Sequence, residues 1–190
     1  MKQIIPHTAL AVLAAVLCTS AAQAADEELQ KESEQAIASF KKADSTLSTF
    51  FKDSAGFAIL PSVGKGGFIV GGARGKGLVY ATNTIIGEAT MTQASIGAQV
   101  GGQSFSEVIF FETPAALDDF KAGKFEMSAE VSAVVAAEGA SKAAKYKNGI
   151  AVFTVPKSGA MVQASIGGQK FKFEPEAAKT TGKATEKKSD

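Results

Sequence analysis

The sequence predicts an α+β fold: a mainly antiparallel, curved and barrel-like β-sheet with an N-terminal amphipathic helix and a short second helix. Three observations support this class. Apolar residues follow a helical spacing early in the chain, and short β-branched and aromatic runs come after them. Many of the 19 glycines lie between or within these runs, where they are typical of turns and of bends in a curved sheet.

The N-terminus has the parts of a secretory signal peptide. Lys2 precedes an apolar run over residues 9–17, and an Ala-Gln-Ala site ends at residue 24. The run is too short to cross a bilayer, which needs roughly 20 apolar residues. We therefore predict a signal peptide over residues 1–24 and export of the protein, which would be periplasmic or associated with the outer membrane, with secretion from the cell as a further alternative.

Cleavage at this site would remove the one cysteine, Cys18, and the one histidine, His7. Lipidation of Cys18 is the alternative, but the residue before it, Leu17, is larger than the small residue that a lipoprotein signal requires. Without cysteine no disulfide can form, so burial and backbone pairing must stabilise the exported domain.

The remaining chain suits one domain, which we place at residues 25–175. Residues 176–190 contain no apolar side chain larger than alanine and are rich in Lys, Thr and Glu. Such a segment cannot bury enough surface to offset its ordering entropy, so we predict a disordered tail.

Residues 26–52 have a helical pattern, with Lys and Glu between apolar positions. The apolar positions are Leu29, Ile37, Phe40, Leu47, Phe50 and Phe51. Asp26 is the expected N-cap, and residues 53–56 are the expected stop. A second helix is expected from Thr113 to Gly123, because Pro114 is preorganised for a first helical turn.

Strands are predicted where apolar, β-branched or aromatic runs are bounded by glycine or proline. These runs cover residues 57–60, 67–70, 78–81, 108–111 and 150–155. Residues 126–138 are either an alanine-rich helix or a strand with Met127, Val131 and Val135 on one face, and we favour the strand.

An internal repeat links two parts of the chain. Residues 91–99 return as residues 161–169, with Val162 and Gly168 in place of Thr92 and Ala98. As strands, both copies would place Met, Gln, Ser, Gly and Gln on one face. We infer that the copies occupy related places in one curved sheet; the alternative is chance similarity between two strands of small residues.

The exported chain lacks a catalytic constellation. Loss of His7 removes Ser-His triads, histidine acid–base catalysis and most zinc or iron sites. The Ser62-x-x-Lys65 motif enters a glycine-rich loop instead of a helix, and residues 64–77 lack the spacing of a phosphate-binding loop. We expect neither enzyme activity nor a cofactor or metal.

A basic stretch is the remaining functional signal. Residues 139–173 carry aromatic side chains and no acid, and their lysines are Lys142, Lys145, Lys147, Lys157, Lys170 and Lys172. This pattern suits phospholipid head groups or nucleic acid. A net charge of only +1 and an export signal favour lipid and argue against nucleic acid. The alternative is an ordinary solvated face, balanced by the acidic first helix.

We predict that anionic phospholipid binds at two basic clusters. The first cluster contains Lys142, Lys145 and Lys147. The second lies in the glycine-rich segment and contains Lys65, Arg74 and Lys76.

Several glycine-rich blocks resemble the SYLF domain family in order and spacing. They are residues 57–63, 65–68, 71–77 and 94–104, followed by the strand at 108–111 and the helix around Leu117 and Phe120. The resemblance covers about residues 36–173. It implies a lipid-binding module: eukaryotic members bind phosphoinositides, partly through an N-terminal amphipathic helix, fungal members also bind actin filaments, and bacterial relatives are exported proteins or lipoproteins.

The residues and the resemblance together favour non-catalytic binding of anionic phospholipid, with phosphoinositide-like head groups, at the cell envelope. The alternative is an envelope structural or interaction protein that binds a protein partner. Because we predict export, actin is not an expected partner.

Overall fold

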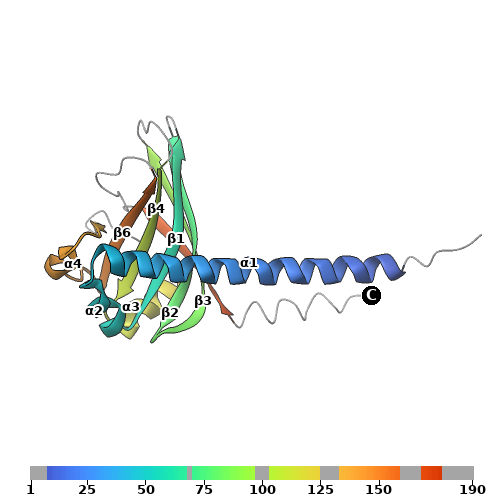
Figure 1. Ribbon diagram of the computed structural model, residues 1–190, viewed down its shortest axis with the longest axis horizontal. Coiled ribbons are helices and arrows are strands. Elements are labelled where there is room, and N and C mark those ends of the chain that lie inside the picture. The colour runs from blue at the N-terminus through green and yellow to red at the C-terminus, as the bar shows by residue number, and fades with distance from the viewer. Residues whose placement is uncertain (1–7, 68–69, 97–102, 125–132, 159–167, 177–190) are drawn as a thin grey trace, which may run out of the picture.

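The computed structural model describes residues 8–67, 70–96, 103–124, 133–158 and 168–176. Four helices and seven strands lie in these residues (Figure 1). In chain order they are α1 (Thr8–Ala43), α2 (Leu47–Asp53), β1 (Gly56–Gly67), β2 (Val70–Ala81), β3 (Thr84–Ile96), β4 (Gln103–Phe111), α3 (Pro114–Lys121), β5 (Val134–Val135), α4 (Ala140–Ala143), β6 (Ile150–Ser158) and β7 (Gln169–Pro175).

The strands form one sheet in the order β5-β6-β4-β1-β2-β3-β7. Neighbours pair antiparallel, except for β5 and β6, which are parallel. The predicted α+β class with a mainly antiparallel, curved sheet is confirmed. Within the described residues the sheet does not close into a barrel, because β5 and β7 form its two edges.

The sheet curls strongly between β4 and β7. Four strand spacings of about 4.8 Å would separate these strands by about 19 Å in a flat sheet. Gln169 Nε2 on β7 nevertheless donates a hydrogen bond of 2.9 Å to Glu107 Oε2 on β4. The inner faces of the two strands therefore meet across the hollow of the sheet.

A bulge in β1 contributes to this curvature. The register of β1 against β2 and against β4 shifts around Pro61, which has no N–H to donate to a ladder. The Pro61 carbonyl accepts instead from Ser106 Oγ at 2.7 Å. Opposite the bulge a Cβ on Gly77 would lie 2.0 Å from the Ile59 carbonyl oxygen, so only glycine permits this approach.

Two hydrophobic cores lie on the two faces of the sheet. The inner core includes Leu60, Met91 and Phe120, with α3 and β7 packed near it. The outer core lies between the sheet and the helices α1 and α2, and includes Phe40 and Phe110. Figure 1 shows α1 crossing one face of the sheet and extending beyond it.

The first helix differs from its prediction in two respects. Residues 26–52 do not form one helix, because α1 ends at Ala43 and α2 begins at Leu47. Asp26 is not an N-cap, since α1 begins at Thr8 and runs through it. The predicted apolar stripe is correct: Leu29, Phe40, Leu47 and Phe51 are buried, and Ile37 and Phe50 are half-buried.

The predicted short strands belong to longer ones, and one prediction was wrong. Residues 67–70 are not a separate strand, because Gly67 ends β1 and Val70 begins β2, and Gly67 pairs with Gly71. The antiparallel pair of Gly67 with Gly71 makes β1 and β2 a hairpin, and residues 68 and 69 lie outside the description. A second hairpin joins β2 to β3 through Thr82 and Asn83, both at positive φ, as a two-residue type I′ turn requires.

The second predicted helix is confirmed as α3. The Thr113 side chain caps it by accepting from the Ala116 N–H, and Pro114 lies in its first turn. Of the ambiguous residues 126–138, β5 supports the strand at Val135, whereas Met127 and Val131 lie outside the described residues. The predicted tail lies outside them too, apart from Glu176.

The structure describes the start of the first copy and the end of the second, so the prediction that the copies occupy related places stays a prediction. Met91 and Gln93 of the first copy lie on β3 and are buried, as the predicted face requires. Gln169, the last residue of the second copy, begins β7 and pairs with Gln93. Residues 97–99 and 161–167 lie outside the description.

In the part of the chain that the structure describes, no helix combines the length and apolarity needed to cross a membrane.

Candidate functional site

The first basic cluster (Lys142, Lys145 and Lys147) lies between β5 and β6. Lys142 is on α4, and the other two lysines lie on the segment that leads into β6. All three side chains are exposed. The structure therefore brings the three predicted residues together on one short surface segment.

A buried carboxylate anchors this segment to the α1–α2 turn. Asp44, which is fully buried, accepts hydrogen bonds from the Gly139 N–H at 3.1 Å and the Ser141 N–H at 2.7 Å. It also accepts from the N–H and hydroxyl of Thr46. Burial alone would raise the pKa of this carboxyl, but the hydrogen bonds outweigh it and hold the pKa well below its usual range.

Replacing Asp44 by asparagine should lower the free energy of unfolding by about 2 kcal/mol at neutral pH, because an amide cannot accept all of these hydrogen bonds. A carboxyl whose pKa is depressed by folding stabilises the fold above its unfolded pKa of 3.8 and loses that contribution as pH falls through the folded value. The difference between wild type and Asp44→Asn in urea unfolding should therefore shrink in strong acid. Asp53→Asn, at an exposed position, should change little.

Tyr146 fixes the direction of its two lysine neighbours. Its ring lies 5.3 Å from the Phe50 ring, between centroids. Burial, with Glu112 and Asp53 nearby, raises the pKa of Tyr146 to about 12. Lys145 and Lys147 are exposed, whereas Tyr146 is half-buried, so the two lysine side chains point away from this aromatic contact.

A tight turn completes the segment. Asn148 and Gly149 both have positive φ, at 53° and 76°, as in a type I′ turn. Lys147 and Ile150 exchange two backbone hydrogen bonds of 2.8 and 3.0 Å around them. The turn holds Lys147 beside the start of β6.

The two lysines border an apolar pocket of about 340 Å³. Its lining comes from β5, α4, the lysine segment and β6: Val134, Ala143, Ala144, Lys145, Lys147, Ile150, Ala151, Val152 and Phe153. The lysines are visible in the sequence, but the pocket is not, because β5 and β6 are separate segments of the chain. This surface combines cations with an apolar floor.

The second basic cluster differs from its prediction in composition. Arg74 and Lys76 lie on one face of β2. The β3 residues that pair with them also pair with Lys170 and Lys172 on β7. These four cations form the second surface. In the sequence, Lys170 and Lys172 belong to the basic stretch of residues 139–173. For Lys65 the structure describes only the backbone, which pairs with Ala73 and Gln103.

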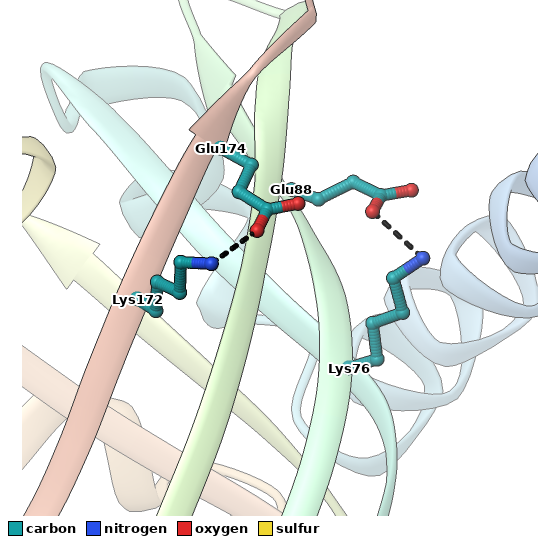
Figure 2. A network of polar contacts seen from close by, with 4 residues as sticks. All are labelled: Lys76, Glu88, Lys172 and Glu174. Atoms are coloured by element: carbon teal, nitrogen blue, oxygen red, sulfur yellow. Dashed lines mark ion pairs between the residues drawn. The ribbon is translucent and has the colours of Figure 1, made fainter. Parts of the chain in front are cut away.

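Acids neutralise part of this second surface (Figure 2). Lys76 Nζ lies 2.7 Å from Glu88 Oε2, and Lys172 Nζ lies 2.7 Å from Glu174 Oε1. The bonded Glu174 carboxylate raises the pKa of Lys172. Two of the cations on the second surface are therefore already paired with carboxylates, which weakens the attraction of this surface for an external anion.

A polar cluster inside the curved sheet escaped sequence analysis. Glu107 on β4 is fully buried, beside its register partner Thr154 on β6 and opposite Gln169 on β7. Among the described residues, Glu107 Oε1, Thr154 Oγ1 and Gln169 Oε1 have no hydrogen-bond partner. The signal was present: alternation along β4 places Glu107 on the face of Phe105 and Ile109.

Ser62, from the Ser-x-x-Lys motif, lies within β1 and is exposed. The described residues contain no group of three or more His, Cys, Asp or Glu side chains able to hold a metal ion.

The curved sheet, with its apolar pocket bordered by lysines, has the features of a ligand-binding domain. Residues 92–181 match the family model Ysc84, described as "Las17-binding protein actin regulator". Beta cell expansion factor A from Aeromonas veronii is 31% identical over 109 residues, which are 56% of this chain and 42% of that relative. The match to the Ysc84 (SYLF) family model over residues 92–181 agrees with the SYLF resemblance of the glycine-rich blocks.

Proposed function

We propose that this protein binds anionic phospholipid through Lys142, Lys145 and Lys147 and has no catalytic role. The observation that carries the proposal is the apolar pocket beside exposed lysines on a segment anchored by Asp44 and Tyr146. A lipid head group would meet the ammonium groups, while its apolar part would meet the pocket. Phosphoinositide-like head groups, with their high negative charge, suit such a cluster.

We further propose that this binding takes place at the cell envelope. The proposal rests on the secretory signal pattern of residues 1–24. Part of this pattern lies within α1, which continues without a break into the helix that packs on the sheet. Removal at residue 24 would leave the packed portion of α1 from Leu29 onward intact.

Changing Lys142, Lys145 and Lys147 to glutamate should weaken binding to anionic vesicles by at least two orders of magnitude. Each lysine near an anionic surface contributes about 1 kcal/mol, attenuated beyond a Debye length of about 8 Å at physiological salt. The measurement is co-sedimentation with phosphatidylglycerol vesicles. Added salt should mimic the substitution, and neutral vesicles should bind poorly.

The matched control reverses three charges on the second surface: Arg74→Glu, Lys170→Glu and Lys172→Glu. We expect this variant to keep most of the binding, because Glu88 and Glu174 already neutralise part of that surface. Equal binding by wild type and both variants would mean that neither surface is the lipid site. A protein partner at the cell envelope would then become the better explanation.

A further inference from the structure

We propose that the pocket beside Lys145 and Lys147 takes one acyl chain of an anionic lipid, while the head group stays at the lysines. This inference rests on the proposed function and adds to it the part of the lipid that is recognised. Adsorption to a charged surface needs no pocket. Insertion of a chain does, and it would make affinity depend on chain length.

The lining of the pocket matches an acyl chain chemically. Val134, Ile150, Val152 and Phe153 supply aliphatic and aromatic surface, and Ala144 keeps the space open. The volume of about 340 Å³ lies within the roughly 300–1,000 Å³ of small-molecule sites. The lysine stems extend the apolar wall, while their ammonium groups reach water at its rim.

In the described residues, β5 pairs with only part of β6. Its two residues pair only with Phe153 and Thr154 of β6. Residues 150–153 of β6 line the pocket, and Lys147 forms a backbone bridge with Ile150 at the start of this stretch.

Charge complementarity selects an anionic lipid. In the described part of the chain, the charged side chains that line the pocket are Lys145 and Lys147, and Lys142 is exposed nearby on α4. A carboxylate or phosphate at the rim would be attracted to these ammonium groups, whereas a cationic amphiphile with the same chain would be repelled.

The test uses soluble single-chain probes below their micelle concentration, measured by calorimetry with the full chain. Decanoate and dodecanoate should bind, with affinity rising roughly fourfold for each added methylene until the pocket is full. Dodecyltrimethylammonium should bind at least tenfold more weakly than dodecanoate. Ala143→Trp places a large ring at the pocket, at an exposed position, and should weaken dodecanoate binding at least tenfold.

Ala115→Trp is the control, at an exposed position of α3 outside the pocket, and it should bind dodecanoate like wild type. Absence of dodecanoate binding, affinity that does not change with chain length, or equal binding by Ala143→Trp and wild type would overturn the inference. Loss of binding in both tryptophan variants would overturn it too. Vesicle binding that still requires the three lysines would then leave the proposed function intact, so the two failures can be distinguished.

Discussion

Replacing Phe40 by alanine should lower the free energy of unfolding by about 3–5 kcal/mol, the range for truncation of a buried aromatic side chain. The Phe40 side chain is 0% exposed and belongs to the outer core between α1 and the sheet. Removing its ring would leave a cavity that the β-strands cannot easily close. Urea unfolding followed by circular dichroism measures the change.

Gln35→Ala is the matched control, because Gln35 is exposed on the same helix. It should change the free energy of unfolding by less than about 0.5 kcal/mol. If Phe40→Ala kept wild-type stability but lost vesicle binding, α1 would be a membrane-binding element instead of a packing element. The SYLF resemblance suggests that role for an N-terminal amphipathic helix, so the comparison separates the two functions.

Local patterns predicted the elements of this fold well. The apolar spacing from Leu29 to Phe51 defined the packing face of α1 and α2, and Pro114 marked the first turn of α3. The break between α1 and α2 was missed, because Asp44 ends the helix through hydrogen bonds to Gly139 and Ser141, which are distant in sequence. Such a contact leaves no periodic signal.

The candidate site was predicted only in part, because some of its contacts join residues that are distant in sequence. Lys142, Lys145 and Lys147 are close in sequence, so their clustering was visible. Predicting the pocket would require knowing that Val134 lies beside Phe153, which the sequence does not show. The regrouping of Lys170 with Arg74 depends on the order β2-β3-β7, which local periodicity does not encode.

The buried Glu107 should make the protein less stable as pH rises from about 4.5 to about 7. Burial raises the pKa of this carboxyl from 4.5 to about 7, opposed by the hydrogen bond from Gln169. Between these values the folded state keeps a proton that the unfolded state has released, so stability falls with increasing pH and levels off above about 7. At about 1.4 kcal/mol per pKa unit, the loss is about 3 kcal/mol.

Glu107→Gln removes this ionisation while keeping the size of the side chain. Because the neighbours that face Glu107, namely Thr154, Leu60 and Gln169, carry no charge, the effect should belong to this carboxyl. Urea unfolding of both proteins at pH 5 and pH 8 provides the measurement. From pH 5 to pH 8, the free energy of unfolding of wild type should fall by about 2–3 kcal/mol more than that of Glu107→Gln. The control Glu112→Gln, at an exposed position next to the end of β4, should show the same pH dependence as wild type. Parallel pH profiles for wild type and Glu107→Gln would show that Glu107 does not ionise differently in the folded and unfolded states.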